Sequence, residues 1–305
     1  MSILPVAAAQ YPIGRFADFA AWHAHAADWV ATAAGQGAKL LLFPEYGAME
    51  LTSLLPEALQ QDLTGQIGAL QRYHDDFVAA WAEFAARHGV HIVAPSLPVT
   101  AGKEKGDSGI VNRSYLLAPN GAVAYQDKRQ MTRFEREAWI IEGGAGLKVF
   151  DLDFGHAAPL RVGITICYDV EFPLIAQAMA QAGADLILCP SCTDTLAGAN
   201  RVQTGARARA LENQVFVAVS PTVGLAEWSP AVDVNVGWAS MLATPDRGMP
   251  DDGVIAMGEL SKPGWVHAEL DFDALRQTRE DAQVYTRRDW PAQSQPSLDV
   301  TPVSL

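Results

Sequence analysis

Three side chains of the types that catalyse acyl transfer stand at the ends of apolar, strand-like segments. Glu45 ends KLLLFPE, Lys128 ends AYQDK, and Cys167 ends VGITIC. Catalytic groups in α/β folds concentrate beyond strand ends, because side chains there leave the core while the sheet still fixes them. A thiol can attack a carbonyl, a carboxylate can carry the proton, and an ammonium can stabilise the thiolate and the developing oxyanion. The combination indicates a thiol hydrolase.

Each of the three residues alone has an ordinary structural interpretation. Glu45 can cap a loop, Lys128 can lie in a solvated turn, and a lone Cys167 can fill the core as a small hydrophobe. The pKa of an unperturbed thiol is ~8.5, so we expect the ammonium and the N–H groups of the following helix to favour the thiolate. The backbone N–H of Tyr168 can supply a second donor to the oxyanion. Asp169 is expected to fix this turn through backbone hydrogen bonds rather than to react.

Two other kinds of site have weaker support. His156 precedes the strand that ends at Cys167, and a short strand does not easily bring these two residues together as a cysteine–histidine pair. Cys189 and Cys192 form a C-x-x-C pair, but no second pair or paired histidines accompany it, and the seven histidines show no H-E-x-x-H pattern. We therefore expect no metal and no cofactor.

The composition is that of an ordinary globular protein. The chain of 305 residues is 49% hydrophobic, which allows a large core, and its net charge of −13 without a basic run argues against nucleic acid and against an anionic membrane surface as partners. No apolar run reaches the length of a transmembrane helix, and MSILPVAAAQYPIG is interpreted as a first strand rather than a signal peptide. Three cysteines cannot form a disulfide framework, and their odd number fits a reducing cytoplasm.

The elements that must position these residues alternate between strands and helices. Strands are predicted at 3–10, 39–45 and 90–96, and helices at about 16–34 and across about 55–88. IVNRSYLLAPNGAVAYQDK predicts a hairpin with its turn at Pro119, Asn120 and Gly121. This pattern indicates an α/β fold with a mixed sheet.

Beyond residue 160 the alternation resumes. LRVGITIC, ADLILCPS and VFVAVSPT are predicted strands, and EFPLIAQAMAQAG and NRVQTGARARALENQ are predicted helices with one apolar face each. We find no repeat or linker, so we expect one domain over 1–280. The tail, 281–305, is rich in Pro, Ser and Gln and is expected to pack on the surface or on a partner subunit.

These motifs together resemble the Glu-Lys-Cys signature of the nitrilase superfamily of carbon–nitrogen hydrolases. The resemblance rests on Pro44-Glu45 after an apolar strand, Lys128 after a hairpin, and CYD at 167–169 followed by FP at 172–173. AAAQYPIG, ARARALENQVFVAVS and GWASMLATP extend it over most of the chain. The individual motifs are short, but their order and spacing together are highly specific.

The resemblance implies a fold, an assembly and a set of roles. The fold is a four-layer αββα sandwich, and the helices at about 171–182 and 200–213 match elements that pair across a twofold axis in a homodimer or a larger homo-oligomer. Cys167 is implied as nucleophile, Glu45 as general base and Lys128 as the cation of the oxyanion hole. A second glutamate usually follows the lysine. FEREAWIIEGG offers Glu135, Glu137 and Glu142, of which Glu137 is favoured by its distance to the glycine turn at 143–144.

The implied reaction is hydrolysis of a small-molecule amide through a cysteine thioester. Amide-cleaving branches often carry Cys-Tyr-Asp, as at 167–169, whereas nitrilases usually carry Cys-Trp-Glu. The alternatives are a nitrilase and a catalytically silent scaffold of the same fold. Relatives that act on carboxylates often have arginine in the two positions before the Phe/Trp-Pro pair, where this chain has Val170 and Glu171. An acid facing the pocket predicts a neutral or cationic substrate, although Glu171 could simply open its helix.

Overall fold

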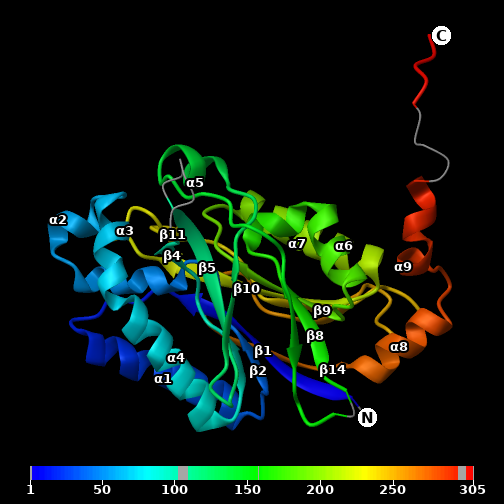
Figure 1. The fold of residues 1–305 in the computed structure, drawn as a ribbon, viewed down its shortest axis with the longest axis horizontal. Helices are drawn as coiled ribbons and strands as arrows, with labels where there is room; N and C mark the ends of the chain where they lie inside the picture. The colour runs from blue at the N-terminus through cyan, green and yellow to red at the C-terminus, as the bar shows by residue number, and fades with distance from the viewer. Residues whose placement is uncertain (1, 102–108, 157, 295–299, 305) are drawn as a thin grey trace.

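The computed structural model describes residues 2–101, 109–156, 158–294 and 300–304. Helices flank a central mixed sheet that folds back on itself (Figure 1). The helices are α1 (Phe19–Gly35), α2 (Glu57–Gln60), α3 (Gly65–Leu70), α4 (His74–His88), α5 (Arg133–Glu137), α6 (Pro173–Gln181), α7 (Leu196–Asn213), α8 (Phe272–Glu280) and α9 (Thr286–Asp289), with 3₁₀ turns η1 (Gly47–Leu54), η2 (Gln71–Tyr73), η3 (Cys167–Glu171) and η4 (Trp290–Ser294).

The strands form two halves of this sheet. They are β1 (Ile3–Pro12), β2 (Leu40–Leu42), β3 (His91–Val93), β4 (Leu97–Thr100), β5 (Ile110–Leu117), β6 (Val123–Asp127), β7 (Val149–Leu152), β8 (Leu160–Ile164), β9 (Leu186–Ser191), β10 (Phe216–Leu225), β11 (Val234–Asn235), β12 (Ser240–Leu242), β13 (Val254–Met257) and β14 (Gly264–Asp271). The first half has the order β4-β5-β3-β2-β1, with β6 on β5 and β14 on β1. The second has the order β10-β9-β8-β7, with β11 and β12 on β10 and β13 on β12.

Strand β1 joins the two halves. It runs parallel to β2 and antiparallel to β14, and its last residues pair in parallel with β10 through Tyr11↔Thr222 and Pro12↔Val223. Parallel pairs also link β2 to β3, β8 to β9 and β9 to β10, whereas β3–β5, β5–β6 and β7–β8 are antiparallel. The α/β fold with mixed sheets expected from the sequence is confirmed.

Alternation along the strands of the first half separates two apolar cores. Val6 and Leu40 point toward the second half and join a core that also contains residues of β8, β9 and β10. Ala7 and Leu41, one residue further along, point the opposite way and join a core with aromatic residues of α1 and α4. Because successive side chains of a strand leave opposite faces, this pattern buries both faces of the sheet. Helices α6 and α7 cover the outer face of the second half, which completes four layers (Figure 1).

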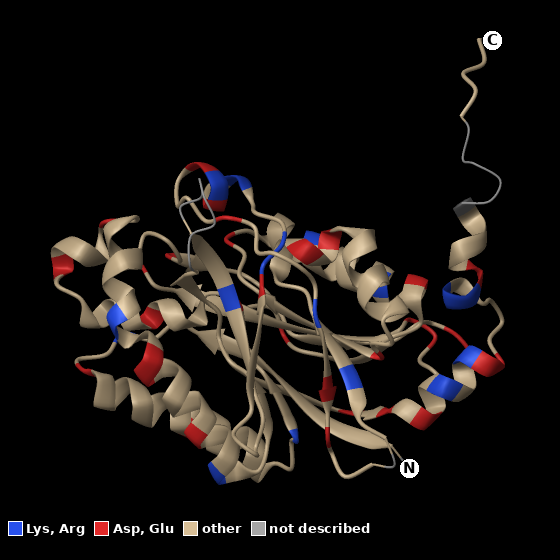
Figure 2. Cartoon of the chain, viewed as in Figure 1, with Lys and Arg blue, Asp and Glu red and all other residues tan. Residues whose placement is uncertain are grey.

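Local signals in the sequence explain where the helices begin and end. Asp18 accepts a hydrogen bond from the N–H of Ala21 and so caps α1, and Gly89 ends α4 in the left-handed conformation. The segments coloured for charged residues lie mostly on the helices and loops, and few lie on the central strands (Figure 2). The helices predicted across 55–88 are α2, which begins directly after Pro56, α3 and α4.

The strand ends differ from the sequence prediction where the chemistry lies. Strand β2 ends at Leu42, three residues before Glu45, and β8 ends at Ile164, three residues before Cys167. Cys167 is instead the first residue of η3. The predicted hairpin is present as β5 and β6, and Lys128 directly follows β6.

The tail contains α9 and η4 and is tied to the body through Arg287. Its guanidinium donates to the carbonyls of Ala180, Ala184 and Asn213, at the ends of α6 and α7.

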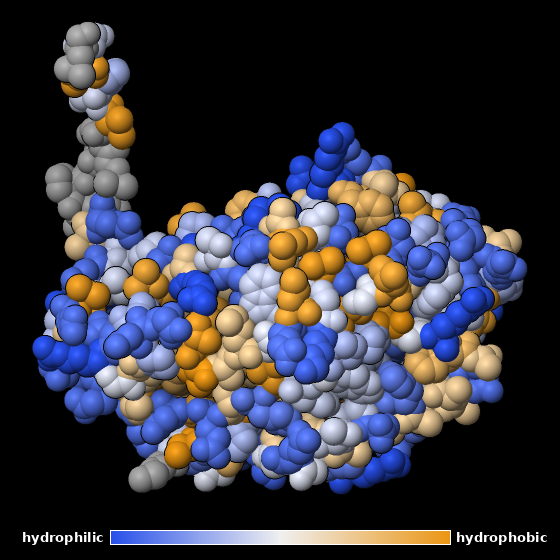
Figure 3. Space-filling model, turned by 180° about the vertical axis from the view of Figure 1, so that it is seen from behind, coloured by the Kyte–Doolittle hydropathy of each residue, from blue (hydrophilic) through white to orange (hydrophobic). Residues whose placement is uncertain are grey.

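Seen from behind, the surface carries several separate groups of apolar side chains among polar ones (Figure 3). Within the part of the chain that the structure describes, no helix combines the length and the hydropathy needed to span a bilayer.

Candidate active site

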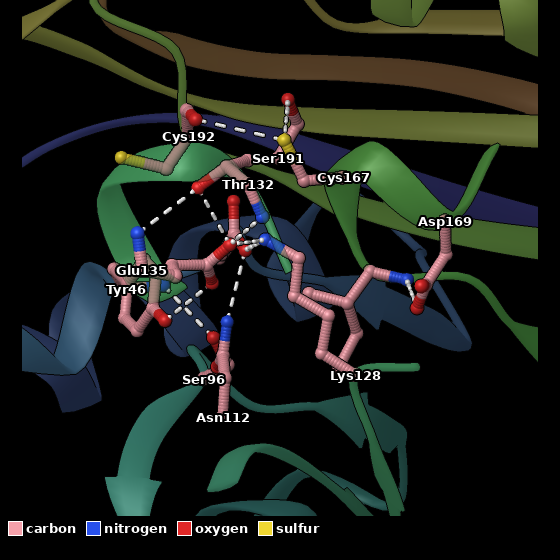
Figure 4. Close-up of polar contacts among 12 residues, drawn as sticks. Tyr46, Ser96, Asn112, Lys128, Thr132, Glu135, Cys167, Asp169, Ser191 and Cys192 are labelled. Atoms are coloured by element: carbon pink, nitrogen blue, oxygen red, sulfur yellow. Dashed lines mark hydrogen bonds and ion pairs between the residues drawn. The ribbon is translucent and has the colours of Figure 1, made fainter. Parts of the chain in front are cut away.

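The ammonium of Lys128 lies between two buried carboxylates. Its Nζ donates to Oε1 of Glu45 at 2.7 Å and to Oε2 of Glu135 at 2.6 Å, and all three side chains are buried. Glu45 Oε1 also accepts from Nδ2 of Asn112 at 2.9 Å. Figure 4 shows the side chains of Asn112, Lys128 and Glu135 converging from different elements. The burial of three charges is offset by their mutual hydrogen bonds.

The second glutamate beside the lysine is Glu135, so the choice of Glu137 from the sequence was wrong. Glu135 Oε2 accepts from the N–H and the hydroxyl of Thr132, and its Oε1 accepts from the hydroxyl of Tyr46 at 2.6 Å. Glu137 lies on the exposed side of α5 and pairs with Arg133. Residues two apart on a helix point in different directions, so only one of the two can reach the lysine. Glu142 lies beyond the helix, where its N–H donates to Ile110.

The turn that carries Cys167 is held in an unusual conformation. Cys167 has φ 49°, in the left-handed region that residues other than glycine rarely adopt. The carboxylate of Asp169 accepts from the N–H groups of Ile166, Arg129 and Gln130 at 2.7–3.1 Å. Asp169 thus fixes the turn, as expected, and also ties it to the segment that follows Lys128.

The sulfur of Cys167 has two close polar neighbours from the end of β9. Its thiol donates to the backbone carbonyl of Cys192 at 3.5 Å, and the hydroxyl of Ser191 donates to Sγ at 3.7 Å. Both contacts are drawn in Figure 4. One neighbour favours the thiol and the other favours the thiolate.

The environment of Cys167 favours the thiol over the thiolate, although Lys128 acts in the expected direction. Burial raises the pKa of this thiol well above its ordinary value, the carboxylate of Glu45 raises it further, and Lys128 opposes both effects only in part. Lys128 has its own pKa held high by Glu135 and Glu45, in spite of burial, and stays charged. A thiolate at this position therefore forms only when a base removes the proton.

Glu45 has the properties of that base. Burial raises its pKa to about 7, with Lys128 opposing the rise, and its carboxylate lies close enough to Cys167 for the two groups to affect one another's titration. Burial would also raise the pKa of Glu135, but hydrogen bonds from Lys128 and Tyr46 bring it below its ordinary value. Glu135 thus stays ionised and holds the lysine, while Glu45 can exchange a proton near neutral pH.

These groups lie on the wall of a cavity of about 630 Å³. Its lining comes from the strand ends, α5, η3, the start of α7 and the segment before β11: Glu45, Tyr46, Lys128, Thr132, Arg133, Phe134, Glu135, Trp139, Cys167, Tyr168, Glu171, Cys192, Thr193, Asp194, Gly198, Arg201, Val202, Pro230, Ala231, Val232, Asp233 and Val234. The volume suits a small molecule, and the mixture of aromatic, aliphatic and charged side chains suits a substrate with both apolar and polar parts.

Glu171 faces the cavity, but its charge has a partner. Its Oε1 lies 3.5 Å from Nε of Arg201, which also lines the cavity. Arg201, thirty residues later on α7, offsets the charge of Glu171, which the sequence alone leaves unopposed. Tyr168 also lines the cavity, with its ring against Phe172.

The residues of the two alternative sites lie in other surroundings. His156 lies before the start of β8 and Cys167 beyond its end, so the length of the strand separates them. Across the described ranges, His, Cys, Asp and Glu side chains make no group of three that could hold a metal ion. Cys189 is buried in β9, and Cys192 contributes its carbonyl and its side chain to the cavity.

Comparisons with known proteins agree with this architecture. The model of the carbon–nitrogen hydrolase family matches residues 5–280. The probable hydrolase YhcX of Bacillus subtilis is 29% identical over 280 residues, which are 92% of this chain and 52% of YhcX, so the chain spans about half the length of that relative.

Two solved structures show the same fold. Nit3 of Saccharomyces cerevisiae, a member of branch 10 of the nitrilase superfamily, matches with a TM-score of 0.70 at 20% identity, over 94% of this chain and 96% of that one. A mutant amidase from Nesterenkonia sp. AN1, with the acetamide moiety of fluoroacetamide added covalently at the active site cysteine, matches with a TM-score of 0.63 at 22% identity, over 94% of this chain and 96% of that one.

Proposed function

The chain belongs to the carbon–nitrogen hydrolase family of the nitrilase superfamily, and on that premise we propose that it hydrolyses a small-molecule amide through a thioester on Cys167. The observation that carries the proposal is the Lys128 ammonium held between Glu45 and Glu135 on the wall of the cavity that Cys167 also lines. Base, cation and nucleophile share one buried site, as acyl transfer requires.

In the first half of the reaction Cys167 displaces the nitrogen. Glu45 takes the thiol proton as Sγ bonds to the carbonyl carbon, and the carbonyl electron pair moves onto oxygen, where Lys128 and the N–H of Tyr168 stabilise the negative charge. The intermediate collapses as the carbon–nitrogen bond breaks, and Glu45 gives its proton to the departing nitrogen. Ammonia or an amine leaves, and the acyl group stays on sulfur.

In the second half water releases the acid. Glu45 accepts a proton from water as the water oxygen bonds to the thioester carbon, and the resulting intermediate collapses with cleavage of the carbon–sulfur bond. The electron pair of that bond stays on sulfur, and Glu45 returns the proton to it. A base whose pKa is about 7 suits both directions of proton transfer.

Two findings support an amide rather than a nitrile as substrate. The nucleophile is followed by Tyr168 and Asp169, the pattern that resembles the amide-cleaving branches, and the Nesterenkonia relative is described as an amidase. The Glu171–Arg201 pair balances one charge at the cavity, so Glu171 does not exclude a carboxylate-bearing substrate by itself.

The test is a hydrolysis screen of the wild-type protein and Cys167→Ala. Neutral, cationic and anionic amides of equal length are compared with the matching nitriles by release of ammonia, and mass spectrometry of the intact protein reports the acyl adduct. We expect turnover of amides, no turnover by Cys167→Ala, and an adduct that maps to Cys167. Turnover of nitriles with inert amides would contradict the amide assignment, and an adduct on Cys189 or Cys192 would contradict the nucleophile.

A further inference from the structure

We propose that Ser191 is a further catalytic residue, whose hydroxyl donates a hydrogen bond to the Cys167 sulfur whenever that sulfur carries negative charge. This inference rests on the proposed function, because it assigns a role in the same thioester chemistry. It concerns a residue outside the Glu45, Lys128 and Cys167 set and outside the cavity lining.

The geometry places the hydroxyl against the reacting atom. Ser191 Oγ lies 3.7 Å from Sγ of Cys167, a normal separation for a hydrogen bond to the larger sulfur atom, and the two residues are only 2% and 4% exposed. Ser191 is the last residue of β9, in parallel register with Pro221 of β10. Its position is therefore set by the centre of the second half of the sheet rather than by a mobile loop.

A buried sulfur needs such a donor. Cys167 is only 4% exposed, so few water molecules can solvate a thiolate there, and the second close neighbour, the Cys192 carbonyl, is an acceptor that can pair only with the protonated thiol. The Lys128 ammonium is hydrogen-bonded to Glu45 and Glu135, so two of its three donor positions are already used. Ser191 supplies a donor aimed at sulfur itself.

Ser191 acts in those steps of the reaction in which negative charge lies on the Cys167 sulfur. As the thiol proton passes to Glu45, negative charge develops on Sγ, and the hydrogen bond from Ser191 strengthens. The charge then moves to the carbonyl oxygen, and it returns to sulfur when the carbon–sulfur bond breaks in deacylation. Ser191 transfers no proton in either step. It lowers the free energy of the two states in which sulfur holds the electron pair.

The experiment measures the reactivity of Cys167 without a substrate. Wild type, Ser191→Ala and Ser191→Thr are alkylated with iodoacetamide between pH 6 and 10, and peptide mapping separates Cys167 from the other two thiols. We expect Ser191→Ala to react about 10- to 100-fold more slowly at neutral pH, with its rate profile displaced toward higher pH. Ser191→Thr keeps the hydroxyl and should retain most of the rate. Glu45, Lys128 and Cys189 also act on this thiol and are unchanged in all variants.

A matched control is Ser220→Ala on the neighbouring strand. Ser220 is also fully buried, but its hydroxyl donates to the carbonyl of Ala9 and lies outside the cavity lining. It reports the general effect of deleting a buried hydroxyl, and we expect its alkylation rate to match wild type. Equal rates for Ser191→Ala and Ser220→Ala would overturn the role of Ser191. Absence of Cys167 alkylation in wild type would instead contradict the proposed nucleophile, so the two failures are distinguishable.

Discussion

The two carboxylates beside Lys128, those of Glu45 and Glu135, have different environments and therefore different pKa values. Both contact the same ammonium, but Glu135 receives further hydrogen bonds from Tyr46 and Thr132, and its pKa falls while that of Glu45 rises. A carboxylate with several donors stays charged, and one in a poorer hydrogen-bond environment can titrate. The two glutamates are therefore not interchangeable.

Replacement of the two candidate glutamates of α5 separates their roles. Glu135→Gln should reduce kcat/KM by at least about 100-fold, because it removes the charge that holds Lys128. Glu137→Gln, on the exposed side of the same short helix, should change kcat/KM less than about twofold. Steady-state kinetics of the two variants, with circular dichroism as a check of folding, measures the difference. Equal losses would contradict the assignment of Glu135.

The pH dependence of turnover should report Glu45. Its pKa is raised to about 7, chiefly by burial, and only the ionised form can accept the thiol proton. We therefore expect kcat/KM to rise about tenfold per pH unit below pH 7 and to level off above it. Initial rates between pH 5 and 9 with a neutral amide give the profile. A rate independent of pH from 5 to 8 would show that another group is the base.

Among the elements, α7 packs closely against η3, the turn that carries the proposed nucleophile Cys167. Arg209, buried in α7, donates to the carbonyl of Val170, and an added Cβ at Gly205 would meet that carbonyl oxygen at 2.9 Å. Helix and turn thus approach closely only because position 205 has no side chain. The left-handed Cys167 lies in the same turn.

Two glycine substitutions test this contact. Gly205→Ala should lower the free energy of unfolding by about 1–3 kcal/mol and slow alkylation of Cys167, because the turn must move away from the helix. Gly35→Ala, where the added methyl group meets nothing within 4 Å, should leave alkylation unchanged and raise helix stability by up to about 1 kcal/mol. Urea unfolding and iodoacetamide kinetics are measured on both. Unchanged alkylation in Gly205→Ala would contradict a supporting role of α7.

A further buried carboxylate, Glu50, ties η1 to the first half of the sheet. Glu50 is fully buried and accepts hydrogen bonds from Tyr11, Trp22 and the N–H of Gly14, yet burial outweighs these donors and raises its pKa from 4.5 to about 8. The folded protein therefore keeps a proton that the unfolded chain loses above pH 4.5. The stability that this proton contributes is complete below pH 4.5 and is lost progressively as the pH rises from 4.5 to 8.

Glu50→Gln should make the free energy of unfolding depend less on pH. Between pH 5 and 8 the free energy of unfolding of the variant should fall by about 2–4 kcal/mol less than that of wild type, since a proton-linked change amounts to about 1.4 kcal/mol per pH unit. Urea unfolding at both pH values measures the change, with the exposed Glu57→Gln as the control for loss of a charge. If the free energy of unfolding changed equally with pH in wild type and in Glu50→Gln, Glu50 would be ionised in the folded protein over the whole range from pH 5 to 8.

The sequence predicted the elements well where local signals decide them. The strand and helix alternation and the β5–β6 hairpin follow from periodicity and turn residues, whereas Glu45, Lys128 and Cys167 were brought together by their places near strand ends and by the family resemblance. Thr132 and Glu135, three residues apart, form a capping box, a visible pattern that would have favoured Glu135 over Glu137. The contacts of Ser191 and Arg201 depend on how distant segments meet, which a single sequence does not show.

For the whole molecule we propose assembly as a homodimer through α6 and α7. These helices form the outer layer over the second half of the sheet (Figure 1), and Leu174, Leu196 and Leu211 on them are exposed. A groove along α7 lies beside them and shares Glu171 and Arg201 with the active-site cavity. A twofold interface would cover this surface.

Two aspartate substitutions test the interface. Leu174→Asp, at a position that is 70% exposed on α6, should shift the mass measured by light scattering at micromolar concentration from dimer to monomer. Leu260→Asp, at a position that is 52% exposed in the segment between β13 and β14, should leave the mass unchanged. A monomeric wild type would rule out the dimer, and a dimeric Leu174→Asp would place the interface elsewhere.

The pairing of β1 has a consequence for how the chain acquires its structure during synthesis. The first strand is hydrogen-bonded to β14 over the whole run from Ile3↔Asp271 to Gln10↔Gly264, and Ser2 contacts Asp273. At a synthesis rate of about 5–20 residues per second, β1 leaves the ribosome many seconds before β14 has been synthesised. Until then β1, the strand that joins both halves, has an unpaired edge. The sheet can therefore be completed only after β14 has been synthesised. Such long-range pairing predicts slow refolding in vitro. It also predicts a dependence on chaperones that shield the edge of β1 until β14 is available.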